Sequence, residues 1–147
     1  MEVAQEDNLA LTNSGSCLCG AVTFRTHGPL RGIVYCHCSQ CRKQSGHFYA
    51  ATNVQDGCIE VNGADMLHWY AASSKARRGF CKNCGSTLFW KHKELDYVSV
   101  LAGAFNQPTG LKGACHIFVE DKGDYYEIDD GLPQFPRSTP SVTVVED

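Results

Sequence analysis

Three cysteines, Cys36, Cys38 and Cys41, fall within the six-residue segment CHCSQC. Thiolates are favoured zinc ligands, and zinc binds four ligands in a tetrahedron. Three protein ligands and one open coordination position form the usual pattern of a catalytic zinc site. The spacing therefore predicts such a site, whose fourth position could hold water, a substrate thiol or a nearby histidine. The alternative is a closed structural site completed by Cys58, Cys115 or a histidine.

Four further cysteines form two pairs that lie far apart in the sequence. They are Cys17 and Cys19, followed by Gly20, and Cys81 and Cys84, followed by Gly85. Such short loops let two thiolates reach one metal, and the glycine lets the backbone fold back without a Cβ clash. The pairs predict a closed structural zinc site that joins distant segments, and hence two zinc ions per chain. The alternative is that these are free, buried cysteines, as we expect of Cys58 and Cys115.

A zinc site with an open position suggests chemistry between a thiol and a carbonyl. It would hold an incoming thiol as a thiolate, which could attack a small carbonyl compound and make a carbon–sulfur bond. His37 is a candidate proton shuttle because it lies between two of the cysteines. Arg42 and Lys43 could offset the thiolate charge or bind a substrate carboxylate, the alternative being a solvated basic pair. His47 and His116 are weaker candidates.

The composition limits the other functions that the chain could have. It has 147 residues, nine cysteines and a net charge of −3. Nucleic-acid-binding proteins are more often basic, so the charge argues against that role. No stretch approaches the roughly 18 apolar residues of a membrane span, and the acidic N-terminus lacks the pattern of a signal peptide. We therefore expect a cytoplasmic protein, in which an odd number of grouped cysteines indicates metal binding rather than disulfides.

Short runs of alternating apolar and polar residues predict the elements that hold these cysteines in place. The strand-like runs are residues 20–26, 33–35, 48–54, 58–61, 67–70, 75–80, 87–90, 97–101 and 117–119. Residues 39–45 could form one or two helical turns. Many short strands separated by turn signals predict a mainly β domain with little helix. Four aromatic residues are assigned to its core, with substrate stacking as the alternative: Trp69, Tyr70, Phe89 and Trp90.

Three motifs and two shorter similarities occur in one order along the chain. They are GSCLCGAV from Gly15, YCHCSQCRK from Tyr35, FCKNCGS from Phe80, HIFVE from His116 and GLP from Gly131. Together they resemble the glutathione-dependent formaldehyde-activating enzyme (GFA) family. The resemblance implies antiparallel β-sheets of the Mss4-like fold. It also implies a carbon–sulfur lyase that joins glutathione to formaldehyde or runs the reverse reaction.

The resemblance implies a division of the cysteines that agrees with their spacing. It implies a structural zinc on Cys17, Cys19, Cys81 and Cys84, and a labile, catalytic zinc on Cys36, Cys38 and Cys41. The expected partners are a small thiol such as glutathione and a small aldehyde, with the true substrate left open. Two non-enzymatic alternatives also remain open, namely a zinc-stabilised binding module and a zinc or thiol sensor.

The polar N-terminus, the prolines near the end and the extent of the resemblance together suggest how the chain is organised. We expect a flexible segment at residues 1–14, a zinc domain at residues 15–137 and a tail at residues 138–147. The proline-containing segment from Gly131 is expected to run extended along the surface. Exposed sheet edges would permit a homodimer.

Overall fold

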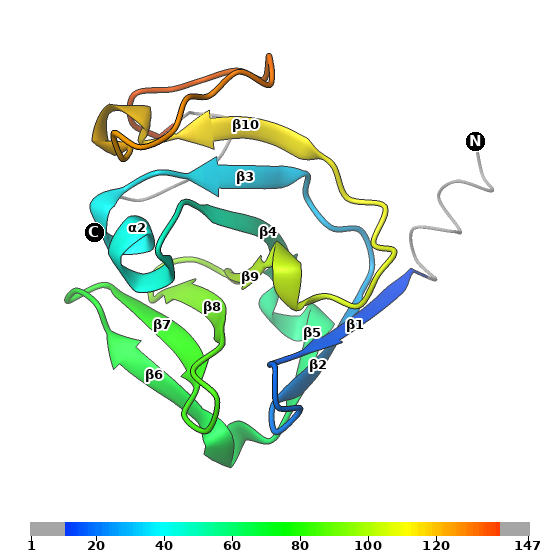
Figure 1. Cartoon of the computed structure of the whole chain (residues 1–147). Coiled ribbons are helices and arrows are strands. Elements are labelled where there is room, and N and C mark those ends of the chain that lie inside the picture. Colours follow the sequence, from blue (N-terminus) through cyan, green and yellow to red (C-terminus); the bar gives the residue numbers. More distant parts are fainter. Residues whose placement is uncertain (1–10, 139–147) are drawn as a thin grey trace.

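The computed structural model describes residues 11–138, which form two β-sheets and one α-helix (Figure 1). The smaller sheet has the order β1-β2-β5, and its strands span Thr12–Ser16, Thr23–His27 and Ile59–Asn62. The larger sheet has the order β10-β3-β4-β9-β8-β7-β6. In that order its strands span Gly113–Ile117, Ile33–Cys36, Tyr49–Gln55, Tyr97–Leu101, Thr87–His92, Ala76–Cys81 and Leu67–Ala71. Helix α2 spans Ser39–Ser45, and short 3-10 helices span Asp56–Cys58, Ala64–Met66, Ala102–Ala104 and Val119–Asp121.

The prediction of a mainly β domain of antiparallel sheets with little helix is confirmed. Among the strands described, β10 and β3 form the one parallel pair, and all other pairs are antiparallel. Strand β2 shows the expected alternation, since Phe24 and Thr26 are buried while Thr23 and Arg25 are exposed. The helix expected at residues 39–45 is present as α2.

The main core joins the two sheets. Phe24 of β2 meets the rings of Phe89 and Phe105 edge-on, with ring centroids 5.5 and 5.2 Å apart. Gly15 of β1 allows the small sheet to approach closely, because a Cβ atom there would lie 2.3 Å from the carbonyl oxygen of Ala104. These contacts fix the first strands, and with them the loop that carries the first cysteine pair, against the larger sheet.

Two strands differ from the sequence-based prediction. Strand β1 includes residues 12–14 of the segment expected to be flexible. It lacks apolar alternation and forms because its backbone pairs with β2. The strand expected at residues 117–119 is wrong except for Ile117, the last residue of β10, because Phe118 adopts a left-handed φ of 55° and a 3-10 helix follows. The rest of the predicted N-terminal segment up to residue 10, and the tail from residue 139, lie outside the described residues.

The aromatic residues assigned to the core have different positions. Phe89 is buried, and Trp69 packs against the same cluster. Tyr70 is 58% exposed, so its core assignment is wrong; it lies on β6, the edge strand of the large sheet. Trp90 lines a cavity, which agrees with the alternative of a substrate-facing role rather than with a core position.

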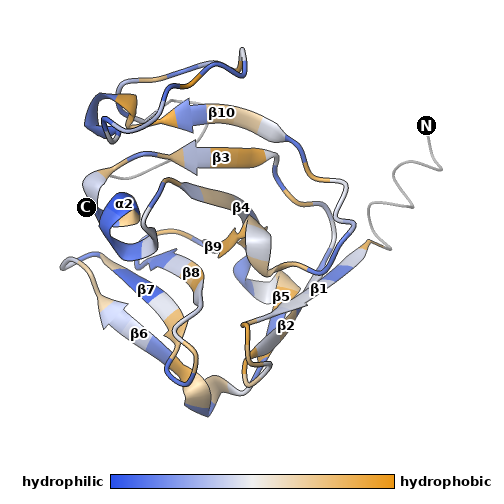
Figure 2. Cartoon of the chain, in the orientation of Figure 1, coloured by the Kyte–Doolittle hydropathy of each residue, from blue (hydrophilic) through white to orange (hydrophobic). Residues whose placement is uncertain are grey.

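Helix α2 brings one cysteine to the inner side of the curved sheet. Figure 1 shows the helix between β3 and β7, and Figure 2 shows that most of it is hydrophilic. Cys41 is its one buried residue. The Sγ atom of Cys38 caps the helix by accepting a hydrogen bond from the Cys41 backbone N–H at 3.4 Å, and Gly46 ends it with a φ of 84°. The cap thus places two cysteines one helical turn apart.

The described part of the segment after Gly131 runs beside β10, a pairing that its composition did not predict. The His116 backbone N–H donates to the carbonyl oxygen of Pro133, and the Phe135 N–H donates to the carbonyl oxygen of His116, both at 2.9 Å. These bonds cover the open edge of the large sheet next to β10. Within residues 11–138, no helix has the length and apolar character needed to cross a membrane.

Candidate metal centres and the adjoining cavity

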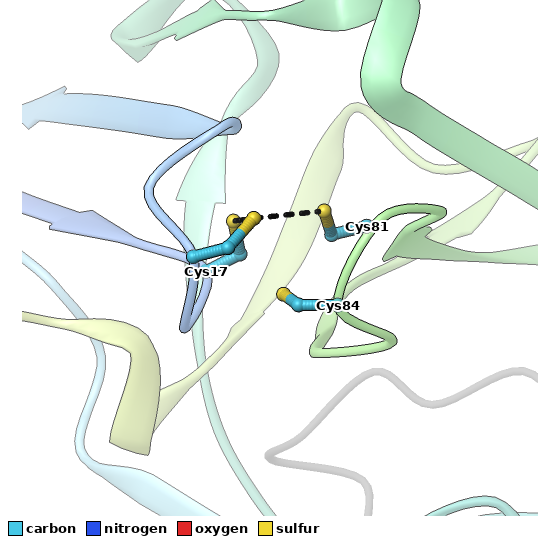
Figure 3. A group of neighbouring side chains, drawn as sticks. Cys17, Cys81 and Cys84 are labelled. Atoms are coloured by element: carbon cyan, nitrogen blue, oxygen red, sulfur yellow. Dashed lines mark hydrogen bonds between the residues drawn. The ribbon is translucent and has the colours of Figure 1, made fainter.

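The four paired cysteines converge from two loops. Cys17 and Cys19 follow β1, Cys81 ends β7, and Cys84 lies in the turn before β8. Their four sulfur atoms lie within 4.8 Å of one another. Figure 3 shows the side chains of Cys17, Cys81 and Cys84 directed toward a common centre. We call these four residues the outer group.

The geometry of the outer group fits a tetrahedral metal site. The Sγ atoms of Cys17 and Cys19 are 3.7 Å apart, and those of Cys19 and Cys81 are 3.8 Å apart. Zinc–sulfur bonds of about 2.3 Å would place the sulfurs roughly 3.8 Å apart, whereas a disulfide needs about 2.05 Å. Gly20 and Gly85 have φ values of 83° and 81°, which explains why glycine follows each pair.

The other three cysteines converge where β3 meets α2. Cys36 ends β3, Cys38 caps the helix and Cys41 lies within it. Their Sγ atoms lie within 4.8 Å of one another, and we call them the central triad. Hydrogen bonds from Cys36 and Cys41 lower the pKa of the Cys38 thiol to about 2. The sequence pattern therefore brings three sulfurs together, and their mutual hydrogen bonds favour the thiolate form at Cys38.

The central triad has no fourth protein ligand in the part of the chain that the structure describes. Within residues 11–138, no histidine, carboxylate or further cysteine joins the group. Cys58 packs against the main core, and Cys115 lies in a separate core cluster with Val34 and Ile117. The closed alternative, with Cys58 or Cys115 as the fourth ligand, thus finds no support in this geometry.

A cavity of about 270 Å³ adjoins the central triad. All three cysteines line it, together with alternate residues of β4, namely Tyr49, Ala51 and Asn53. Alternate residues face the same side of a strand, so the cavity lies along one face of the large sheet. Its size is close to the lower end of the range for small-molecule pockets.

Arg78 of β7 reaches the central triad across this cavity. Its side chain is buried, and Nη1 lies 3.6 Å from the Sγ atom of Cys41. Nη2 donates to Oε1 of Gln40 at 3.2 Å, and the guanidinium lies over the ring of Tyr49. Burial works against the charge of Arg78, but the Cys41 and Tyr49 side chains raise its pKa above the usual range. A fixed positive charge therefore faces the sulfurs.

Arg42 and Lys43 do not line the cavity. Successive helical residues are rotated by about 100°, so the turn that points Cys41 inward directs the next two residues elsewhere. Lys43 is exposed, and Arg42 is partly buried. Sequence reasoning missed Arg78 because it lies 37 positions after Cys41. Its position two residues after Ala76 in a predicted strand could have indicated that Arg78 faces the same, inward side as Ala76.

His37 lies outside the cavity lining and belongs to a buried hydrogen-bond chain. Its Nδ1 atom lies 2.5 Å from Oη of Tyr126, and its Nε2 atom lies 2.8 Å from Nδ1 of His116. Nε2 of His116 lies 2.8 Å from a carboxylate oxygen of Asp130. Burial and the neighbouring His116 lower the pKa of His37 to about 4. The remaining candidate, His47, is exposed and outside the cavity lining.

Comparison with known proteins finds a matching family model and related proteins. The family model described as glutathione-dependent formaldehyde-activating enzyme matches residues 12–121. An uncharacterized lyase of Schizosaccharomyces pombe is 30% identical over 115 residues, which cover 77% of this chain and 82% of the relative. A Halomonas elongata protein, provisionally named a glutathione-dependent formaldehyde-activating enzyme, is 31% identical over 128 residues. The match covers 78% of this chain and 80% of the relative.

A solved structure supports the fold assignment. The crystal structure of a Rhodobacter sphaeroides protein superposes with a TM-score of 0.55 and 25% identity, covering 66% of this chain and 91% of that protein. The family match includes all seven cysteines of the outer group and the central triad. Since it also spans most of the chain, this protein belongs to the glutathione-dependent formaldehyde-activating enzyme family.

Proposed function

We propose that this protein is a zinc-dependent carbon–sulfur lyase or synthase that acts on adducts of a thiol and an aldehyde. The observation that carries the proposal is the central triad, which presents three sulfurs to a cavity without a fourth protein ligand among the described residues. Membership of the family, one relative named as a lyase and one named as a glutathione-dependent formaldehyde-activating enzyme support the reaction class. Glutathione and formaldehyde are the proposed substrate pair, and the cytoplasm is the proposed location.

In this proposal the two cysteine groups hold one zinc ion each. The outer group would hold a structural zinc, because four sulfurs fill its coordination positions. The central triad would hold a labile zinc through Cys36, Cys38 and Cys41. When bound there, zinc would lower the pKa of a thiol entering the cavity and so supply a thiolate nucleophile at neutral pH.

Residues of the chain itself set the electrostatics of this proposed site. Three thiolates and a divalent ion would carry a net charge near −1. The guanidinium of Arg78 offsets that charge, because its Nη1 atom lies 3.6 Å from the Sγ atom of Cys41. Tyr49 packs beneath the guanidinium, and burial raises the pKa of its hydroxyl to about 12, so it stays neutral. The site therefore favours positioning of a nucleophile over strong polarisation of a carbonyl.

The proposed reaction needs no redox partner. In the synthetic direction the thiolate sulfur attacks the carbonyl carbon, a carbon–sulfur bond forms, and the carbonyl π electrons move to oxygen. That oxygen takes up one proton, which balances the proton that the thiol lost. The lyase direction reverses each step and breaks the same carbon–sulfur bond. The cavity provides a partly enclosed place for both reactants beside the sulfurs.

The proposal is tested by adduct formation from glutathione and formaldehyde. The zinc-loaded protein should accelerate formation and breakdown of the hydroxymethyl thioether linkage above the spontaneous rate, measured by exchange NMR at equilibrium. Other thiols and aldehydes should be tested in the same way, since the substrate pair is part of the proposal. Cys36→Ser serves as the inactive control, and Cys58→Ser, outside both groups, serves as the active one.

The result also separates the enzyme from a binding module. Acceleration that Cys36→Ser removes would support the lyase. A protein that binds two zinc ions but accelerates none of the thiol and aldehyde pairs would contradict it and favour a non-enzymatic role.

A further inference from the structure

The cavity has a second polar region, which no step of the proposed reaction uses. It is formed by Arg31, just before β3, and by Asn53, Tyr97 and Ser99 on the adjacent strands β4 and β9. Asn53 and Ser99 are direct partners in the sheet register. The four side chains line the same cavity as the central triad.

Arg31 is held in place entirely by uncharged oxygen atoms. Its Nε donates to the carbonyl oxygen of Gly32 at 3.1 Å, and its Nη2 donates to that of Ala51 at 3.0 Å. With the Asn53 amide turned so that its nitrogen donates to Ser99 Oγ at 2.8 Å, its oxygen accepts from Nη1 of Arg31 at 2.6 Å. These three contacts fix the plane of the guanidinium.

The fixed guanidinium keeps donors free for a ligand. Arginine has five N–H donors, and the three contacts use one on each nitrogen, which leaves one N–H on each of Nη1 and Nη2. Two donors on neighbouring nitrogens of one guanidinium can match the two oxygens of a carboxylate.

The charge of Arg31 lacks a carboxylate partner among its described contacts. None of the ion pairs found within residues 11–138 joins Arg31 to an Asp or Glu side chain. Partial burial lowers the pKa of Arg31, because water is removed from the charged group, and the nearby Tyr97 and Cys115 side chains oppose that shift only in part. Burying an unpaired charge costs free energy that an anionic ligand would recover. The cavity lining contains three arginines, Arg31, Arg78 and Arg137, and one carboxylate, Asp121, so cations outnumber anions on its walls.

The sheet register gives the spacing between the two regions. Cys36 of β3 is the partner of Tyr49 on β4, and Asn53 lies four residues farther along β4. At about 3.3 Å per strand residue, Asn53 lies roughly 13 Å along the sheet from the triad end. A ligand that reaches both regions must therefore be longer than a simple alkyl thiol.

We infer that Arg31, oriented by Asn53, binds a carboxylate of the substrate at the end of the cavity opposite the central triad. The site would then select anionic thiols of about the size of a short peptide. The role of the thiol rests on the proposed function, whereas the carboxylate contact can be measured without any reaction.

The test uses S-methylglutathione, which carries two carboxylates but has no free thiol and cannot form an adduct. Its affinity for the zinc-loaded protein, measured by calorimetry, should exceed that of its diethyl ester. Arg31→Gln should weaken binding of the diacid by about 10- to 100-fold, the range for a hydrogen-bonded charged group. The ester should bind the variant and the wild type equally, and Lys93→Gln, an exposed charge change outside the cavity, should have no effect.

Arg31→Lys keeps the charge and removes the paired donors, so it should give an intermediate affinity. It also provides a second variant if Arg31→Gln fails to fold. The inference is overturned if the diacid and the ester bind alike, or if the preference for the diacid is unchanged in both Arg31 variants. Failure of the proposed function is a separate result, since a wild-type protein that accelerates no adduct could still bind S-methylglutathione through Arg31.

Discussion

The outer group and the central triad use the same side chain for different arrangements. The outer group joins segments that are 62 positions apart, as between Cys19 and Cys81, and connects the small sheet to the large one. The central triad comes from six consecutive residues at one strand–helix junction. A metal in the outer group would therefore hold distant parts of the chain together, whereas one in the triad would constrain only a short segment.

The surroundings of the two groups differ as much as their connections do. Cys17 and Cys81 of the outer group are buried in the main core. The triad faces a cavity and has the cation Arg78 beside it. Four sulfurs, two of them in the core, are suited to stability, while three sulfurs on a cavity wall are suited to exchange of a fourth ligand. The number of ligands and what lies next to them, rather than the ligand type, distinguish the two sites.

The largest effect is expected from Cys81→Ser. The mutation removes one ligand of the outer group, the fully buried Cys81, and leaves only three sulfurs in the group. Structural zinc contributes on the order of 10 kcal/mol in small domains, comparable with the whole stability of a domain. We expect the variant to unfold, as measured by circular dichroism and loss of both metals. Cys58→Ser should remain folded, and a folded Cys81→Ser protein with one zinc would show that the outer group is dispensable.

Cys36→Ser should separate activity from folding. Changes to groups that merely orient metal ligands cost about 10- to 100-fold, so loss of a ligand should lower the activity by at least about 100-fold. The fold should persist, because the triad lies within one short segment. Metal analysis should find one zinc per chain in place of two, and thermal unfolding should stay close to that of the wild type. Unfolding of Cys36→Ser would remove the proposed difference between the groups.

Arg78→Met tests whether the cation matters to the triad. Removing a hydrogen-bonded positive charge next to a thiolate should lower activity and metal affinity by about 10- to 100-fold. Methionine fills similar space, so the fold should be retained. Arg77→Met is the matched control, because the neighbouring residue of the same strand is exposed and stacks on Trp69 instead. Equal effects of the two variants in a chelator competition assay would show that Arg78 does not act on the triad.

The spacing of cysteines was sufficient to predict both groups, because metal ligands of this type repeat at short, recognisable distances. The sequence could not show that Arg78 meets Cys41, since that contact depends on how the large sheet curves around α2. The same holds for Arg31, whose partner Asn53 is fixed by the pairing of β4 with β9. The register of the paired strands brings together charges that are far apart in the sequence. A single sequence does not reveal that register.

The alternation of apolar residues predicted most strands but not β1. That strand is polar, and its position depends on Gly15 meeting the backbone at Ala104 rather than on a buried face. The role expected of His37 also depended on the direction in which its side chain points, which the sequence does not show. Its place between two cysteines suggested proton transfer, yet the alternation of the chain at the end of β3 sends its ring into a buried cluster with His116 and Tyr126.

His37→Phe should therefore change stability more than catalysis. It keeps a ring in the buried space but leaves His116 and Tyr126 each without a hydrogen-bond partner from residue 37, which should cost about 1–3 kcal/mol in the free energy of unfolding. Tyr126→Phe should cost less, and the double variant should be less destabilised than the sum, because one hydrogen bond is shared. Activity per folded molecule should stay within about threefold, whereas loss of a proton shuttle costs about 100-fold or more. A loss of that size, with unchanged unfolding, would show that His37 takes part in catalysis. The segment of the central triad would then contribute more to the reaction than its three cysteines.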